Sequence, residues 1–323
     1  MALRGAGRTP FVVTLGEALV SFSVASGHRL EDSRLLEPRV AGAELNVAIG
    51  LARLEVPVQF FGQVGDDPWG RRILAVARGE GVDVSGVTVH PDRPTGVMFK
   101  ESVGLGSGVR VYYLRQGSAA RLYRGSLNLE SACRRARALH LTGISLSLGP
   151  SLRWACDRAL QAAPRSILRV LDLNVRLRLA SPEDWRSLLD RYLPEVNVLL
   201  ATTEELLAVG LEPDAVVRRA ATLGVTAVLR RGGAPTEVLV AGDREERFHV
   251  EPVSAERVVD TVGAGDAFAS SLIAMRLEGA DWTTAVRAGH LAGATVVGGR
   301  GDYEGAPYRR ELRALLGSDW VER

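Results

Sequence analysis

Short apolar runs alternate with longer stretches of helical periodicity along most of the chain. Runs rich in β-branched residues predict buried strands, and apolar residues that recur every three or four positions predict helices with one buried face. We expect strands at Phe11–Val20, Val58–Val64, Ala138–Thr142, Ile167–Leu173, Val196–Leu200 and Ala227–Arg230. We expect helices at Glu44–Leu54, Pro68–Gly79, Ser151–Ala163, Pro182–Leu193, Ala215–Leu223, Ala264–Leu277, Asp281–Val297 and near Tyr308–Leu316.

The alternation of buried strands and helices predicts an α/β fold whose mostly parallel sheet is covered on both faces. One helix start is especially clear, because Ser181 can cap it, Pro182 suits its first turn, and two acids follow near its positive end. No repeat, linker or low-complexity segment divides the 323 residues, so we expect a single domain over residues 1–323.

Two segments, at about 29–40 and 94–115, break this rhythm because they are rich in β-formers and glycine and contain no helix pattern. The stretch "TGVMFKESVGLGSGVRVYYLRQG" alternates like a hairpin with a glycine-rich turn at Gly104–Gly108. We interpret the two segments as a small β-sheet that projects from the main domain. Its tyrosines and Arg115 suit a lid over a substrate, and the alternative is a surface hairpin without a role.

Composition narrows the function classes. With 46% hydrophobic and 24% charged residues, the chain has an ordinary globular composition. Its net charge of +2 gives no electrostatic reason to expect nucleic acid or an acidic membrane surface as a partner. Lys100 is the only lysine, so a mechanism that needs an active-site lysine must use it or be discarded.

The two cysteines and the N-terminus bear on the compartment. Cys133 and Cys156 lie outside any CxxC pair or histidine cluster, which favours reduced thiols over a zinc site or a disulfide framework. A glutamate interrupts the N-terminal apolar run, no cleavage site follows it, and no stretch reaches the ~20 apolar residues of a membrane span. We therefore expect a cytoplasmic protein.

Several familiar motifs are absent from the sequence. There is no G-x-x-x-x-G-K-[ST] stretch and no strand-to-helix G-x-G-x-x-G, which argues against a P-loop and a dinucleotide site. Protein-kinase signatures and a G-x-S-x-G elbow are also missing, and none of the five histidines lies in an HExxH or triad context. These absences leave one glycine-rich stretch with chemical content.

That stretch is "DTVGAGDAF", where Thr261–Gly265 turns into an apolar helix. Glycines let backbone N–H groups approach an anion, and the positive end of the helix adds to the attraction. A phosphoryl group in transfer needs this stabilisation of negative charge. Asp266 follows directly, where a carboxylate could accept the proton of an attacking hydroxyl. The alternative is that Asp266 is only a favourable acid in the first turn of a helix.

The stretch resembles the D-T-x-G-A-G-D signature of the ribokinase-like (PfkB) sugar kinases, and Ala41–Ile73 is similar to the N-terminal signature of that family. The resemblance covers nearly the whole chain. It implies a three-layer α/β/α sandwich with a mostly parallel central sheet and a small β-sheet lid. It also implies that Asp266 is the catalytic base and that the amides of Gly263, Ala264 and Gly265 form the anion hole.

Within the family the chain is most similar to the 2-keto-3-deoxygluconate kinases, through "GEALVSF", "AGAELNVA", "RVYYLRQGSAA", "LHLTGIS", "LDLNVR" and "RGDYEGAP". The resemblance implies that Tyr113 and Arg115 reach the sugar from the lid and that Arg176 lies between the sugar and the phosphates. The implied substrate site comprises Gly42, Asn46, Met98, Tyr113, Arg115 and Arg176.

An acidic substrate fits these residues. Two arginines would neutralise a substrate carboxylate through charge-assisted bonds, and the alternative is that they are exposed arginines without a role. Ser21 stands where kinases of neutral sugars often carry an aspartate, which would repel an acid. Met98 departs from the pattern, because such kinases often have an aromatic residue there.

The same resemblance implies ATP and Mg²⁺ as cofactors and admits a monovalent cation. Glu205 is a candidate outer-shell partner of hydrated Mg²⁺, and the alternative is an acid at a helix start. Two departures lie on the nucleotide side, where the usual second glycine after Gly232-Gly233 is missing and a histidine replaces a frequent asparagine. The implied nucleotide site comprises Arg230, Gly232, Gly233, Gly263, Gly265 and His290.

The resulting hypothesis is ATP-dependent phosphorylation of the terminal 6-hydroxyl of 2-keto-3-deoxygluconate or a close sugar acid. A kinase of fructose, another neutral sugar or a nucleoside is the alternative within the same fold. A non-catalytic sugar-binding regulatory protein is the alternative from another class. The resemblance also implies a homo-oligomer, a dimer or higher, paired through the lid, and we expect no nucleic-acid or membrane partner.

Overall fold

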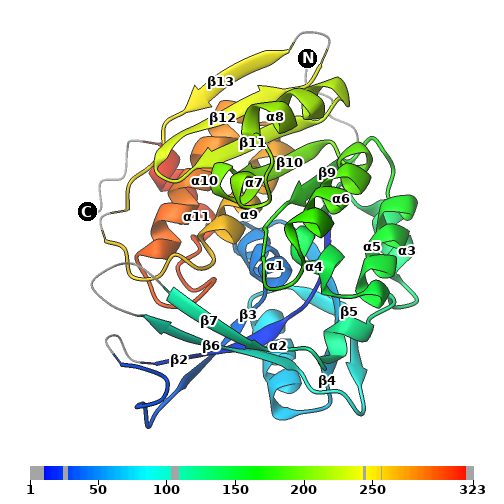
Figure 1. The fold of residues 1–323 in the computed structure, drawn as a ribbon, viewed down its shortest axis with the longest axis vertical. Coiled ribbons are helices and arrows are strands. Elements are labelled where there is room, and N and C mark those ends of the chain that lie inside the picture. The colour runs from blue at the N-terminus through cyan, green and yellow to red at the C-terminus, as the bar shows by residue number, and fades with distance from the viewer. Residues whose placement is uncertain (1–10, 25–27, 103–108, 243–244, 256, 318–323) are drawn as a thin grey trace.

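The computed structural model describes residues 11–24, 28–102, 109–242, 245–255 and 257–317. Figure 1 shows them arranged around one large sheet, with a second, smaller sheet at one end of the molecule. The glycine-rich turn expected at Gly104–Gly108 lies outside the described residues. Among the described residues, no helix is both long enough and apolar enough to cross a lipid bilayer.

The large sheet is mostly parallel, as the alternating pattern predicts. Neighbouring strands from β11 to β5 pair in parallel, whereas at one edge β12 pairs antiparallel with both β11 and β13. In spatial order the strands within the described residues are β13 (Glu246–Val250), β12 (Ala234–Val240), β11 (Thr226–Arg231), β10 (Val198–Thr202), β9 (Leu168–Asp172), β8 (Ala138–Thr142), β1 (Val12–Leu15), β4 (Val58–Gly65) and β5 (Asp83–His90).

Helices cover both faces of this sheet and bury a separate apolar core against each face. One face is covered by the helices from the middle of the sequence. They are α3 (Leu129–Arg135), α4 (Gly143–Leu148), α5 (Pro150–Ala162), α6 (Pro182–Tyr192), α7 (Thr203–Ala208) and α8 (Pro213–Thr222), with the short η1 (Ala119–Leu122) and η2 (Leu193–Glu195). The other face carries α1 (Ala43–Arg53), α2 (Pro68–Gly79), α9 (Ala264–Glu278), α10 (Trp282–Val297) and α11 (Arg309–Leu316). The three-layer α/β/α sandwich is therefore confirmed.

The local signals explain where several helices begin. Ser181 caps α6 in a capping box with Asp184, and Pro182 occupies the first turn, as the sequence predicts. At α2, Asp67 accepts the N–H of Gly70 at 2.7 Å just before Pro68. Each cap satisfies a backbone donor that the helix itself leaves without a partner, which fixes the starting residue.

One predicted strand is wrong. The run Phe11–Val20 is not a single strand, because it divides into β1, which ends at Leu15, and β2 (Leu19–Ser23). The two halves belong to different sheets. Gly16 lies at the break, where a Cβ would collide with the carboxylate of Glu44. An apolar run shows that residues are buried, but it does not show against which sheet they are buried.

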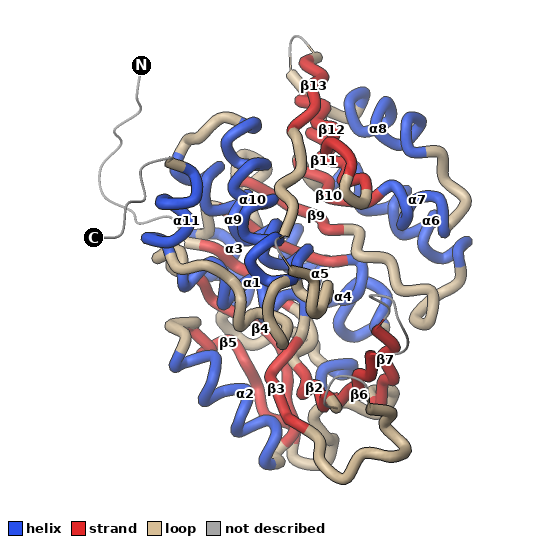
Figure 2. The backbone as a smooth tube through the Cα atoms, turned by 90° about the vertical axis from the view of Figure 1, so that its left-hand side faces the viewer, coloured by secondary structure: helices blue, strands red, loops and turns tan. Residues whose placement is uncertain are grey.

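The smaller sheet has the spatial order β3 (Glu37–Ala41), β2, β6 (Gly96–Ser102) and β7 (Val109–Leu114). It thus takes strands from both segments that break the α/β rhythm, and it adds β2. The β6–β7 pair is the expected antiparallel hairpin, with Met98 opposite Tyr113. Phe22 packs edge-on against Trp69 of α2 at 5.0 Å, which anchors the sheet beside that helix in both views (Figures 1 and 2).

Candidate active site

A pocket of about 380 Å³ opens where the parallel strands of the large sheet end and the smaller sheet approaches them. The carboxyl ends of β1, β8, β9, β10 and β11 share one edge, so the segments that follow them meet there. The lining residues are Glu17, Leu19, Gly42, Ala43, Glu44, Asn46, Met98, Val111, Tyr113, Arg115, Ile144, Asp172, Asn174, Arg176, Thr202, Glu205, Arg230, Thr261, Val262, Gly263, Gly265, Asp266 and Asp302.

The N-terminus of α9 points into this pocket. Gly263 precedes the helix with a φ of 87°, and no side chain caps the helix among the described residues. The first amide of α9, that of Ala264, donates to the carbonyl of Thr261 at 3.4 Å, whereas Gly265 and Asp266 line the pocket and no side chain that the structure describes caps their amides. A Cβ at Gly263 would collide with the backbone carbonyl of Asp302, so this position requires glycine for conformation and for packing. The helix start can bind an anion.

Asp266 lies in the first turn of α9 and is 8% exposed. Asn46 of α1 donates its Nδ2–H to Oδ2 of Asp266 over 2.7 Å, which joins two of the residues expected in the site. Burial raises the pKa of Asp266 to about 8, and the bond from Asn46 acts in the opposite direction. A carboxylate with a raised pKa, oriented by a neighbouring amide, suits a general base that works near neutral pH.

Arg230, near the end of β11, lies beside the anion site. Its Nη2 is 3.6 Å from Oδ1 of Asp172, and its guanidinium stacks over Phe268 at 5.1 Å. A Cβ added to Gly265 would lie 3.0 Å from Nη1 of Arg230, so the glycine leaves room for the arginine. Burial raises the pKa of Asp172 to about 7, while Arg230 lowers it. The pocket therefore pairs a fixed cation with the helix N-terminus.

Asn174 and Arg176 follow β9 and line the same pocket. Asn174 adopts a φ of 45°, which is uncommon for a residue other than glycine. This left-handed residue redirects the chain after Leu173, and Arg176 then donates to its neighbouring carbonyl, that of Val175, at 2.8 Å. The positive charge of Arg176 acts to lower the pKa of both Asp172 and Asp266, which line the pocket with it.

Arg115 reaches the pocket, but not as the unpaired cation that the acidic-substrate argument assumes. Its Nη1 donates to Oε2 of Glu17 at 3.0 Å, and the two side chains are 7% and 1% exposed. Ser118 donates to the other oxygen of Glu17 at 2.6 Å. Arg115 also stacks on the ring of Tyr113 at 4.1 Å. A buried carboxylate thus already balances its charge, while its remaining N–H donors can still serve a ligand.

The remaining residues expected around the sugar lie on the smaller sheet and at the start of α1. Met98 is 4% exposed and packs with Leu19, Ala41 and Tyr113 in an apolar cluster at the wall of the pocket. Gly42 precedes α1 with a φ of 128°, close to the backbone of Glu17. Ser21 of β2 is buried and pairs with Met98 of β6, but it is not among the residues that line the pocket.

Three residues expected at the nucleotide lie outside this pocket. Gly232 and Gly233 form the β11–β12 turn with φ values of 29° and 91°. His290 of α10 has both ring nitrogens engaged, since Nε2 is 2.8 Å from Oγ1 of Thr236 and Nδ1 is 2.9 Å from the carbonyl of Glu251. In this structure His290 therefore ties α10 to β12 and to the segment after β13.

Glu205 is an acid at a helix start, which is one of the two roles that the sequence leaves open. It forms a capping box with Thr202 at the start of α7, where its Oε2 accepts the N–H of Thr202 at 2.9 Å, and it also lines the pocket. Its negative charge acts to raise the pKa of Asp172, another acid that lines the pocket. No group of three or more histidine, cysteine, aspartate or glutamate side chains arranged to hold a metal ion occurs within the described residues.

Four acids of the pocket are missing from the residues expected from sequence. They are Glu17, Glu44, Asp172 and Asp302. Glu44 is 1% exposed and accepts hydrogen bonds from Thr142, at 2.6 Å, and from Ser145. Each acid lies inside a stretch that carries the family resemblance, "GEALVSF", "AGAELNVA", "LDLNVR" or "RGDYEGAP". That location was the available signal, because a charged side chain is costly to bury without a partner or a ligand.

Comparisons with known proteins agree with this geometry. The model of the pfkB family carbohydrate kinases matches residues 9–309. The 2-dehydro-3-deoxygluconokinase of Thermoproteus tenax is 34% identical over 317 residues, which cover 94% of each chain. The 2-dehydro-3-deoxygalactonokinase of Haloferax volcanii is 30% identical and covers 96% of this chain and 98% of its own. A fructokinase of Klebsiella pneumoniae is 32% identical and covers 85% of this chain and 91% of its own.

Solved structures have the same fold. A PfkB protein from Polaromonas sp. JS666 superimposes with a TM-score of 0.80 at 30% identity, covering 94% of this chain and 99% of that one. A ribokinase II from E. coli, solved in complex with ATP and Mg²⁺, superimposes with a TM-score of 0.85 at 24% identity, covering 95% and 99%. The second likeness supports the fold alone.

Proposed function

Because the chain belongs to the pfkB family of carbohydrate kinases, we propose that it transfers the γ-phosphoryl group of ATP to the terminal hydroxyl of 2-dehydro-3-deoxygluconate (2-keto-3-deoxygluconate) or a close sugar acid. The observation that carries the proposal is the position of Asp266 in the first turn of α9. A buried carboxylate held by Asn46 lies directly beside amides that can bind an anion.

In the proposed reaction the sugar hydroxyl lies between Asp266 and the γ-phosphoryl group. Asp266 accepts the hydroxyl proton as the new O–P bond forms, the bond from phosphorus to the β-phosphate oxygen breaks, and ADP leaves. The amides at the start of α9, those of Gly263, Gly265 and Asp266, would stabilise charge on the transferring group, whereas the expected amide of Ala264 already donates to the carbonyl of Thr261 at 3.4 Å. Arg230, which lies beside Gly265, and Arg176 add positive charge there.

The acids of the pocket fit a hydrated Mg²⁺ ion, which when bound would neutralise phosphate charge. Oδ1 of Asp172 is buried without a hydrogen-bond partner among the described residues, and Glu205 lines the same pocket. Mg²⁺ binds through few protein carboxylates and keeps several waters, so two acids in one pocket are sufficient. We assign Asp172 together with Glu205 to this role. A monovalent cation remains an expectation from resemblance, and the assay below includes it as a variable.

The smaller sheet would act as the lid that binds the sugar and excludes water. Met98 and Tyr113 form its wall toward the pocket. Arg115 would hold the substrate carboxylate with the N–H donors that Glu17 does not use, and Arg176, which lines the same pocket, would lie between the sugar and the phosphates. Residues 1–323 would thus form one kinase domain, with the segments at about 29–40 and 94–115 as its lid.

The nucleotide base would lie toward the β11–β12 turn of Gly232 and Gly233, beyond the described pocket.

A homo-oligomer is proposed from the outer face of the lid, where Tyr112 and Leu114 of β7 are 42% and 65% exposed. Light scattering in solution tests that assembly. A kinase that uses ATP also works where ATP is held, so the cytoplasm is the proposed compartment.

A coupled assay of ADP release tests the function. The substrates are 2-dehydro-3-deoxygluconate, its galacto epimer, fructose and a nucleoside, each with ATP and Mg²⁺, with and without potassium. We expect kcat/KM to be at least about 100-fold higher on the sugar acids, as a charge-assisted contact left unmade on the neutral sugars requires. A higher kcat/KM on fructose or the nucleoside contradicts the acid assignment.

Fructose or another neutral sugar is the second candidate because Glu17 already balances Arg115, which weakens the argument for an anionic substrate. The fructokinase relative supports the same alternative. Calorimetry separates a third candidate, a non-catalytic sugar-binding protein, since sugar binding without ADP release from any substrate would favour it.

A further inference from the structure

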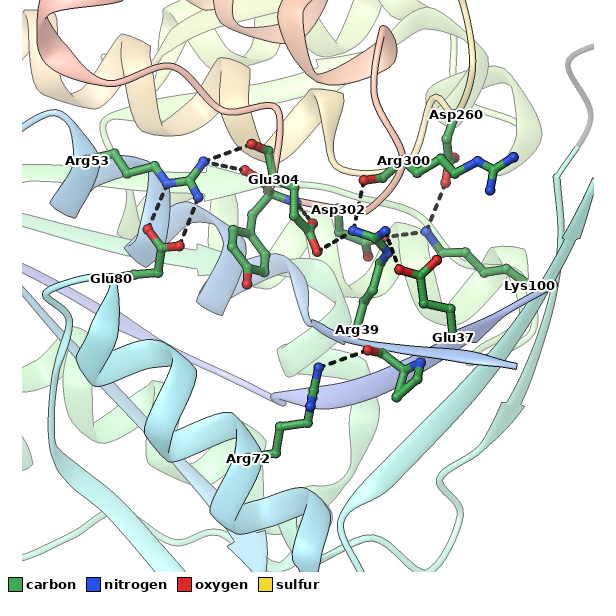
Figure 3. A network of polar contacts seen from close by, with 12 residues as sticks. Glu37, Arg39, Arg53, Arg72, Glu80, Lys100, Asp260, Arg300, Asp302 and Glu304 are labelled. Atoms are coloured by element: carbon green, nitrogen blue, oxygen red, sulfur yellow. Dashed lines mark hydrogen bonds and ion pairs between the residues drawn. The ribbon is translucent and has the colours of Figure 1, made fainter. Parts of the chain in front are cut away.

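Lys100, the only lysine of the chain, lies on β6 of the smaller sheet and is 3% exposed. Its ammonium group donates to Oδ2 of Asp260 at 3.2 Å and to Oδ1 of Asp302 (Figure 3). Burial opposes its charge, but the two carboxylates outweigh burial and raise the pKa of Lys100. The side chain is therefore a fixed cation between two acids.

Both acids belong to segments that shape the start of α9. Asp260 comes before the helix, and its Oδ1 accepts the N–H of Val262 at 2.9 Å, within the turn that ends at Gly263. Asp302 follows α10, and its backbone carbonyl packs against the Cα of Gly263 so closely that no Cβ would fit. A displacement of either acid therefore moves the turn whose amides face the pocket.

Lys100 itself does not line the pocket of Asp266, although Asp302 does. A separate cavity of about 50 Å³ lies on its other side, lined in part by Arg39, Glu101 and Arg300. A buried ion pair contributes little to stability compared with apolar residues of the same volume, so stability alone does not account for this arrangement. The position of the ion pair next to the turn of Gly263 gives another reason for the arrangement.

We propose that Lys100 is a positioning residue for phosphoryl transfer. Its ammonium holds Asp260 and Asp302 together, keeps the turn before α9 in the shape that binds the transferring group, and joins the lid sheet to that turn. The proposal rests on the proposed role of α9 as an anion site. It adds a residue that acts on the transferring group from the lid through two carboxylates, without contacting the substrate.

A comparison within the same network sets the control. Arg39 of β3 also links the smaller sheet to the segment after α10, through the carbonyl of Arg300 at 3.3 Å and Oε1 of Glu304 at 3.0 Å (Figure 3). Unlike Lys100, it bonds to neither Asp260 nor Asp302. Arg39→Met thus breaks a lid contact of the same kind without removing the cation beside the turn.

The experiment is chemical rescue of Lys100→Ala by ammonium ions. The alanine leaves a space between two carboxylates that ammonium can enter, whereas Lys100→Met fills the space with an apolar side chain. We expect kcat to fall about 100-fold in both variants, since small misplacements of catalytic groups have effects of this size. Ammonium chloride should raise the kcat of Lys100→Ala at least about tenfold relative to sodium chloride at equal ionic strength. It should leave the kcat of Lys100→Met unchanged.

The KM for the sugar should change less than about threefold, because the displaced groups act on the transition state. Arg39→Met should keep kcat within about threefold of the unmodified protein and should not respond to ammonium. An unchanged kcat in Lys100→Met, or equal ammonium responses in the methionine and alanine variants, would overturn the proposal.

Loss of folding is separated by a second variant, Lys100→Ala with Asp302→Asn, which removes one of the two unpaired buried charges. If the ion pair is only structural, this variant should recover stability and kcat together. If Lys100 positions the turn, stability recovers and kcat stays low. Calorimetry with Mg²⁺ and a non-hydrolysable ATP analogue, compared with ADP, covers the case in which no tested sugar is phosphorylated. A preference for the analogue that is unchanged by Lys100→Ala then rejects the proposal, whereas sugar inactivity alone rejects only the proposed function.

Discussion

The two sides of the pocket, which we propose to bind the phosphoryl group and the sugar, are built by different means. At the start of α9, backbone groups and one carboxylate of a short segment converge, and the glycine positions determine the geometry. On the smaller sheet the pocket is lined by side chains whose orientation depends on partners far away in the sequence. Arg115, for example, pairs with Glu17, 98 residues earlier.

The difference shows why the sequence predicts the class of reaction more sharply than it predicts the substrate. A turn that requires glycine at Gly263 and a helix that starts beside it leave few possible arrangements, so the motif predicts its own structure. A lid arginine can face a ligand, solvent or a buried acid, and its sequence context is the same in all three cases. The predictions below test the two sides separately, from the largest expected effect to the smallest.

Asp266→Asn should lower kcat about 1,000-fold or more, because the amide cannot accept the hydroxyl proton. The protein should melt at a higher temperature at pH 8. In the unfolded chain this carboxyl ionises at an ordinary pKa near 4, whereas burial raises its pKa to about 8 in the folded state. Between these two pH values the carboxyl is ionised in the unfolded chain and protonated in the folded protein. Folding then requires uptake of a proton, so the free energy of unfolding falls as the pH rises from about 4 to about 8. Steady-state kinetics and thermal melts measure both effects.

A near-normal kcat in Asp266→Asn would remove the assignment of the base. Asn46→Ala is the matched control, because it removes the bond that orients the carboxylate and leaves the carboxylate itself. Its kcat should fall about tenfold to 100-fold, less than that of the Asp266 variant.

The pH dependence of kcat/KM tests the same group in the unmodified protein. A base with a pKa of about 8 must lose its proton to act, so kcat/KM should rise with pH and level off above that value. From pH 8, where half of the base is deprotonated, to pH 6 the expected loss of kcat/KM is about 50-fold. Asp172 and Asp302, which raise the pKa, and Arg176, which lowers it, are the charged groups that act on Asp266. A flat profile between pH 6 and pH 8 would contradict the raised pKa.

On the sugar side, Arg115→Ala should lower kcat/KM about 100-fold on 2-dehydro-3-deoxygluconate and about tenfold on fructose. The shared loss comes from Glu17, which remains buried without its partner, and the difference comes from the substrate carboxylate. The double variant with Glu17→Gln is the control, because it removes the unpaired charge and should recover stability in a thermal melt. Equal losses on both substrates would mean that Arg115 serves only Glu17.

Met98→Ala should have the smallest effect. It removes part of an apolar wall that also includes Leu19 and Tyr113, so the KM for both epimers of the sugar acid should rise about threefold to tenfold. Because this contact is made equally in the ground state and the transition state, kcat should stay within about twofold. A large fall in kcat with an unchanged KM would instead link Met98 to the chemical step.

Periodicity along the chain was sufficient to predict the layers of the fold. Strand β8 and helix α2 have the bounds that the sequence predicts, and the helices that begin near Pro182 and Ala264 start at those residues. Local signals of this kind are strong because a cap or a buried face is satisfied by residues three or four positions apart. The same locality let "GAGD" predict both the start of α9 and the carboxylate beside it.

Contacts across the fold could not be predicted in this way. The split of Phe11–Val20 between two sheets, the pairing of Arg115 with Glu17, and the engagement of His290 by Thr236 all depend on strand order and helix placement. Lys100 is the clearest case, since its partner Asp302 lies 202 residues away. The sequence by itself determined the helix start and the carboxylate in its first turn, because adjacent residues form them. Only the tertiary structure decided which charges meet in the buried space around them.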